Sequence, residues 1–101
     1  MTPQNPAQHA RVAADALERL VRDVQTGRAA WSHPHTVHQA VDDLTRITTA
    51  ASAVLQQLAA THAEYTQPGP RATQCVTALH QAGRHTTTAA SQLRSARHTM
   101  N

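Results

Sequence analysis

Arginines and histidines in the last third of the chain are the residues best suited to chemistry. Residues 66–101 contain four arginines and no Asp or Glu, a formal charge of +4, whereas residues 1–65 contain five arginines and six acids, a charge of −1. Because guanidinium groups bind phosphate and carboxylate oxygens strongly, this charge asymmetry favours an anion-binding function.

Helical periodicity gathers these basic residues on one side. At 100° per residue, four of them fall within an arc of about 80°, and Arg97 lies at its edge. The arc predicts a contact face for nucleic acid or an acidic protein. A solvated polar face that keeps the protein soluble is the alternative. No helix-turn-helix signature, zinc-finger spacing or aromatic platform predicts sequence-specific DNA binding. The residues within the arc are His80, Arg84, Arg94 and His98.

Three histidines near the middle of the chain form a second group. His33, His35 and His38 cluster where a loop is expected to meet a helix, and the last two are spaced to share a metal ion. Zinc prefers three or four ligands, usually with help from Cys or a carboxylate, and none is near in sequence. Because histidines bind metal ions and change charge near neutral pH, a metal- or pH-responsive protein is a third hypothesis. No resident cofactor is expected.

The residue types needed for catalysis are scarce. The three glycines are scattered, so they build no phosphate-binding loop. Cys75 falls on the apolar side of its expected helix, which favours burial as a small hydrophobic residue over a role as a nucleophile. We therefore expect no enzymatic activity.

Start and stop signals divide the chain into three helices, over residues 6–26, 36–65 and 70–99. Asn5 followed by Pro6 is typical of a helix start, and Gly27 of a helix end. Thr36 with Gln39 forms a capping box, although Pro34 is an equally suitable start. The segment TQPGP at 66–70 separates the last two helices.

Each expected helix carries an apolar stripe, and the short breaks imply antiparallel neighbours. The sequence predicts an all-α fold in which residues 1–101 form one three-helix, up-down-up antiparallel bundle. Gly83 either permits close helix packing or weakens its helix. The predicted inward positions are Ala10, Ala13, Leu17, Leu20 and Val24; Val37, Val41, Leu44, Thr48, Ala51, Leu55 and Leu58; and Ala72, Cys75, Leu79, Ala82, Thr86, Ala89 or Ala90, Leu93 and Met100.

The expected core is thin. Large aliphatic residues are few (seven Leu, seven Val and one Ile) and there is no Phe. Self-association would compensate for this, and Trp31 is expected to cover one end of the bundle. Asp42 and Asp43 are interpreted as acids that favour the positive end of a helix dipole.

Features of the chain favour a cytoplasmic location. A single cysteine allows no intramolecular disulfide. No apolar run approaches the roughly 20 residues that span a bilayer, and the first residues lack the pattern of a signal peptide. No membrane association is expected.

The segment QNPAQHARVAADALERLVRDV at residues 4–24, together with the exclusive use of Arg over Lys, resembles small uncharacterised helical proteins of high-GC actinobacteria, Streptomyces in particular. The resemblance extends over most of the chain and implies no activity. The leading hypothesis is thus a non-catalytic helical-bundle interaction protein that binds another macromolecule, most simply a protein, or itself. The alternatives are a nucleic-acid-associated accessory or regulatory protein, which would use the basic face of the third helix, and the metal- or pH-responsive protein.

Overall fold

The computed structural model describes residues 5–27 and 33–100, and Trp31 lies outside them. The chain forms three α-helices, α1 (Pro6–Gln25), α2 (Pro34–Tyr65) and α3 (Pro70–Thr99), with no strand in the described part. The prediction of an all-α fold is confirmed. None of the described helices is long and apolar enough to cross a membrane.

Local signals set the ends of α1. The Asn5 side chain accepts a hydrogen bond from the Ala7 backbone N–H (3.0 Å), and Pro6 occupies the first turn. At the other end, Gly27 has a φ of 73°, a left-handed conformation that favours glycine. The sequence-based bounds therefore hold to within one residue.

The second helix begins two residues earlier than the capping box predicts. It starts at Pro34, because proline has a φ suited to the first turn and no N–H that needs a partner there. The third helix follows the same rule, with Pro70 directly after Gly69. A break of four residues, 66–69, joins the two helices.

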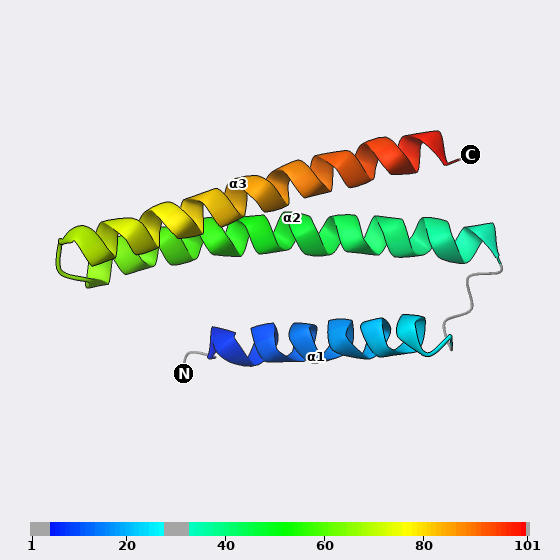
Figure 1. Cartoon of the computed structure of the whole chain (residues 1–101), viewed down its shortest axis with the longest axis horizontal. Helices are drawn as coiled ribbons and strands as arrows, with labels where there is room; N and C mark the ends of the chain where they lie inside the picture. Colours follow the sequence, from blue (N-terminus) through cyan, green and yellow to red (C-terminus); the bar gives the residue numbers. More distant parts are fainter. Residues whose placement is uncertain (1–4, 28–32, 101) are drawn as a thin grey trace. The chain divides into compact units, whose positions relative to one another are not determined.

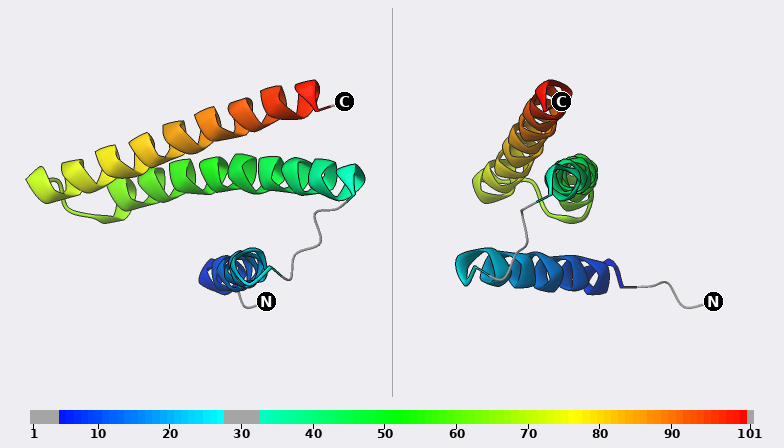
Figure 2. Two further views of the ribbon diagram at one scale, coloured as in Figure 1. Left: turned by 45° about the vertical axis from the view of Figure 1, so that its right-hand side comes forward. Right: turned by 90° about the vertical axis from the view of Figure 1, so that its right-hand side faces the viewer.

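The chain divides into two compact units, Met1–His33 and Pro34–Asn101. In the second unit, α2 and α3 pack side by side as an antiparallel hairpin (Figures 1 and 2). The first unit consists of α1 and its flanking residues. The packing of α1 on the hairpin, the up-down-up order and self-association stay predictions.

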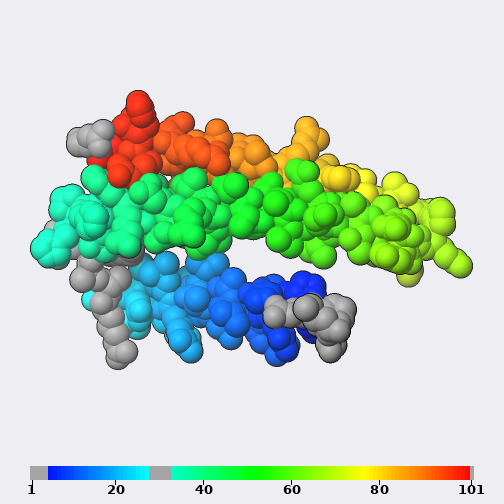
Figure 3. Space-filling view, turned by 180° about the vertical axis from the view of Figure 1, so that it is seen from behind, coloured from blue at the N-terminus to red at the C-terminus, as the bar shows by residue number. Residues whose placement is uncertain are grey.

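A seam of buried and half-buried residues joins α2 to α3, whose side chains touch along much of the hairpin (Figure 3). On both helices the seam positions alternate steps of three and four, the spacing of antiparallel helices that pack at a small angle. The seam comprises His38, Val41, Thr45, Thr48, Ser52, Leu55, Ala59 and His62 on α2 with Thr66 directly after it, and Ala72, Val76, Leu79, Gly83, Thr86, Ala90, Leu93 and Arg97 on α3 with Met100 directly after it.

The most deeply buried seam residues are the smallest ones. Ser52, Ala59, Gly83 and Ala90 are the buried residues of the two helices. A Cβ built on Gly83 would lie 3.3 Å from the Cγ of Gln56. Gly83 thus permits close helix approach, the first of the two roles that the sequence left open. No large side chain of the described residues is fully buried, so the hairpin core is thin.

Hydroxyl groups in the seam are satisfied by nearby carbonyls. Thr48 donates to the Leu44 carbonyl (2.9 Å) and Thr86 to that of Ala82 (2.9 Å). Such bonds to the preceding turn allow threonine to be buried in a helix pair without an orphaned donor. Ser52 adds a bond between the helices, from its Oγ to the Gly83 carbonyl (3.0 Å).

Candidate interaction surface

The hairpin has two faces that differ in chemistry. Residues that directly follow seam positions form the polar face, and those that directly precede them form the apolar face. In an antiparallel pair, the following positions of both helices lie on the same side, as the Arg94–Thr49 bond shows. The polar face comprises Asp42, Arg46, Thr49 and Gln56 with His80, Arg84, Arg94 and His98. The apolar face comprises Val37, Leu44, Ile47, Ala51, Val54, Leu58 and Tyr65 with Cys75, Ala82 and Ala89.

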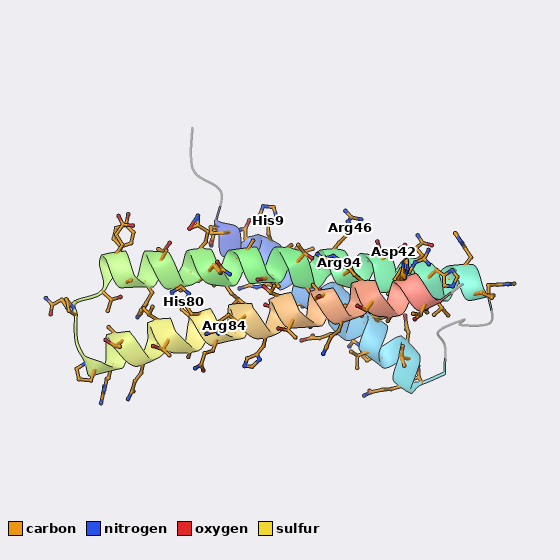
Figure 4. All side chains as sticks on the ribbon, turned by 90° about the horizontal axis from the view of Figure 1, so that it is seen from above. His9, Asp42, Arg46, His80, Arg84 and Arg94 are labelled. Atoms are coloured by element: carbon orange, nitrogen blue, oxygen red, sulfur yellow. The ribbon has the colours of Figure 1, made fainter. Side chains whose placement is uncertain are left out.

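The predicted basic residues of α3 lie mostly on the polar face. His80, Arg84 and His98 are exposed. His80, Arg84 and Arg94 follow one another along α3 (Figure 4). The structure thus places these predicted anion contacts on one side of the helix, although whether they bind an anion stays a prediction.

Two of the predicted arginines are engaged with α2. Arg97 lies in the seam, where its Nε donates to the Asp42 carboxylate (3.0 Å). Arg94 donates from Nη2 to the Thr49 hydroxyl (3.0 Å). Both residues therefore help to hold the hairpin together, and their guanidinium groups are less available to an external anion than that of Arg84.

The helix-dipole interpretation of the acidic pair is wrong. Because α2 begins at Pro34, its first turn contains no acid, and a helix dipole acts mainly within that turn. Asp42 pairs instead with Arg97 of α3. Asp43 pairs with Arg46 on the same helix (3.4 Å). Side-chain partners, one of them in α3, thus account for these acids.

The structure places the three histidines predicted as metal ligands at the start of α2 and directly before it. His33 and His35 are exposed and His38 is half-buried. Within residues 5–27 and 33–100, no three His, Cys, Asp or Glu side chains are arranged to hold a metal ion. Cys75 is half-buried and carries a free thiol.

The apolar face exposes four large hydrophobic side chains of the hairpin. Ile47 is 40% exposed, Val54 56%, Leu58 50% and Tyr65 80%. All four belong to α2, whereas on this side α3 has the small residues Cys75, Ala82 and Ala89 and the exposed polar residues Arg71, His85 and Gln92. A helix pair that leaves such residues on one side presents a surface on which a further helix can pack.

A groove deepens the apolar face beside the connection between α2 and α3. Its volume is about 380 Å³, and no Asp, Glu or Arg lines it. The hydroxyl of Thr66 lies 3.3 Å from Nδ1 of His62. We call this feature the turn-end groove; its lining residues are Leu58, Thr61, His62, Tyr65, Thr66 and Leu79.

Sequence reasoning missed the apolar face because it merged two stripes of α2 into one. It assigned Leu55 and Leu58 to the same inward side, whereas Leu55 lies in the seam and Leu58 is half exposed. The available signal was the spacing: Thr45, Ser52 and Ala59 repeat every seven residues, one position after Leu44, Ala51 and Leu58.

Comparisons with known proteins provide no relative. No protein-family model, no curated protein and no solved structure matches the chain.

Proposed function

We propose that this protein is a non-catalytic helical interaction protein that binds another macromolecule, or itself, through the apolar face of the hairpin. The observation that carries the proposal is the exposure of Ile47, Val54, Leu58 and Tyr65 along one side of α2. Leaving such side chains in water costs free energy in proportion to their apolar area, so their coverage drives association. The cytoplasm, proposed from the single cysteine, is the compartment in which it acts.

Part of this face is proposed to receive α1 and so complete the up-down-up bundle. Described by itself, α1 is amphipathic and buries no residue, and Leu20, Val21 and Val24 are exposed near its end. An apolar stripe of this kind is stabilised by packing against a second apolar surface. The apolar face offers one within the same chain.

The lengths of the helices leave a part of the face for a partner. At 1.5 Å per residue, the 20 residues of α1 span about 30 Å and the 32 residues of α2 about 48 Å. An antiparallel α1 whose last turn lies beside Pro34 reaches only to about residue 54. Leu58, Tyr65 and the turn-end groove lie beyond it, so they form the proposed docking surface.

The test compares two single substitutions in the full chain, Leu58→Glu in the groove and Gln57→Glu next to it. Both add the same charge to an exposed position of α2. Captured host proteins are identified by mass spectrometry, purified and titrated against each variant, while light scattering gives the mass of each variant alone.

The proposal predicts that either a purified partner or a second copy binds the wild type and the Gln57→Glu variant but not the Leu58→Glu variant. If no purified protein binds and the mass stays that of a monomer, the proposed function is wrong. Circular dichroism of both variants checks that the helices are retained.

Nucleic-acid binding through the polar face is a second candidate. It is supported by the exposed Arg84 and by the absence of acids from α3. We expect affinity for duplex DNA at about 50 mM salt, where phosphate contacts are strongest, and a steep fall as salt rises. Arg84→Ala should weaken binding more than the matched change Arg11→Ala in α1. Equal affinity of the two variants, or no binding, would contradict this candidate.

A further inference from the structure

We propose that the turn-end groove binds the turn-end groove of a second copy of this chain, in a two-fold symmetric and antiparallel contact between α2 helices. The inference deepens the proposed function and rests on it: it identifies the partner of the docking surface as the protein itself. It follows from the spacing of the exposed side chains, from the charges around the groove and from the reach of α1.

The spacing of the two exposed groove residues suits reciprocal packing. Leu58 and Tyr65 are seven residues apart, so they lie on the same side of α2 about 10 Å from each other. A two-fold axis that passes between Leu58 and Tyr65, beside Thr61, places Tyr65 of each copy over Leu58 of the other copy. The same two side chains then fill both halves of a self-complementary contact.

The polar groups of the groove are compatible with a copy of itself. No Asp, Glu or Arg side chain lines the groove, so a second copy brings no carboxylate or guanidinium group into the contact. Glu64 is exposed beside it. The proposed axis sets Glu64 of one copy opposite the partner's Ala59, which is buried, so the two carboxylates do not meet.

Tyrosine is a suitable residue for such a contact. Among the residues that the structure describes, Tyr65 is the most exposed large hydrophobic residue, at 80%, and it is the only tyrosine in the sequence. Its phenol combines a large apolar surface with a hydroxyl that can keep a hydrogen bond to water at the rim. Such side chains are common anchors of protein interfaces.

The proposed contact is small, so it is expected to be weak. Each copy contributes three large side chains, Leu58, Tyr65 and Leu79, to the groove. Interfaces of this size are transient, and the dimer is sought by sedimentation equilibrium of the full chain from about 10 to about 500 µM.

The first experiment measures the dissociation constant of the wild type and of two variants. Leu58→Glu introduces a charge into the apolar contact and should raise the constant at least about tenfold. Gln57→Glu adds the same charge outside the groove and should leave the constant within about twofold.

The second experiment tests the register of the contact. In a Cys75→Ser background, one copy carries Leu58→Cys and the other Tyr65→Cys, and the mixture is treated with a short bismaleimide. The account predicts a faster cross-link in this mixture than in one that pairs Tyr65→Cys with Gln57→Cys.

The outcomes separate the two proposals. Monomer at every concentration together with a purified protein that binds at Leu58 overturns the self-association but leaves the proposed function in place. A dimer unaffected by Leu58→Glu, or equal cross-linking in the two mixtures, overturns the turn-end contact. If the wild type neither self-associates nor binds a purified protein, both proposals are wrong.

Discussion

The two faces of the hairpin differ in how they use the same helix. On the polar face, α2 presents Asp42 and Thr49, which hold Arg97 and Arg94 of α3. On the apolar face, α2 exposes Ile47, Val54 and Leu58, and α3 contributes no large hydrophobic residue. The polar face thus closes the hairpin on itself, whereas the apolar face leaves side chains available to a further partner.

The comparison shows that the most deeply buried residues of the hairpin are not its most hydrophobic ones. The hairpin buries Ser52, Ala59, Gly83 and Ala90, which are small, and exposes larger aliphatic residues one position away. Small residues allow the helix axes to approach closely, and close approach is stabilised by dispersion contacts and by the bond from Ser52. The larger side chains are then free to bind elsewhere.

Enlarging the seam should have the largest effect, since the seam separates the two faces. Ala59→Leu places a bulky side chain at a position with no exposure and should reduce the free energy of unfolding by about 3 kcal/mol. Its neighbour Ala60 is exposed, so Ala60→Leu should change stability by less than about 0.5 kcal/mol. Urea denaturation measures both. Equal effects would mean that the seam is misassigned.

Adding charge to each face should discriminate between them. Val54→Glu on the apolar face should reduce the free energy of unfolding by about 1–2 kcal/mol, because the proposed packing of α1 would bury the carboxylate. Ala53→Glu, one position away and also exposed in the hairpin, should have little effect. Thermal denaturation compares them. If both variants melt together, nothing packs on this part of the apolar face.

Removing the hydroxyl at the centre of the seam should have a smaller effect. Ser52→Ala loses the bond to the Gly83 carbonyl, a loss of about 0.5–1.5 kcal/mol. Ser91→Ala on the exposed side of α3 loses no contact between helices and gains helix propensity. The free energies of unfolding in urea should therefore differ by about 1 kcal/mol. A Ser52→Ala variant as stable as Ser91→Ala would show that small size alone holds the seam.

The ion pair on the polar face should contribute least. A double-mutant cycle of Asp42→Ala and Arg97→Ala should give a coupling free energy of about 0.2–1 kcal/mol, because both side chains are partly exposed. The coupling should decrease as salt rises from about 50 mM to about 500 mM. A coupling free energy of zero at low salt would show that the pair of Asp42 and Arg97 does not stabilise the hairpin.

Helix positions were predictable because local residues determine them. Asn5 with Pro6, Gly27 and Pro70 fix helix ends through their own caps and φ angles, without help from tertiary contacts. The start of α2 was ambiguous, since Pro34 and Thr36 are both suitable first residues. The inward side of α3 was predicted only in part: Leu79 and Leu93 lie in the seam, whereas Cys75 and Ala82 lie beside it on the apolar face.

The candidate site was less predictable because it depends on which of two stripes α3 covers. The sequence pattern placed Leu44, Ala51 and Leu58 of α2 on the inward side, but α3 packs on the neighbouring stripe through Ser52 and Ala59. Hydrophobicity alone cannot rank these stripes, because the gain from close packing appears only once two helices meet. The pairing of Arg97 with Asp42, 55 residues apart, was invisible for the same reason.

Two residue types that occur once allow the central claim to be measured directly. The chain has a single isoleucine, Ile47, and a single tyrosine, Tyr65, and both lie on the apolar face. Their NMR signals can be followed in the presence of a neutral paramagnetic chelate, which broadens signals of solvent-accessible groups. The account predicts that the Ile47 methyl is protected at every protein concentration and that the Tyr65 ring becomes protected as concentration rises. An Ile47 methyl as accessible as that of an unfolded peptide, with a Tyr65 ring that never becomes protected, would contradict it.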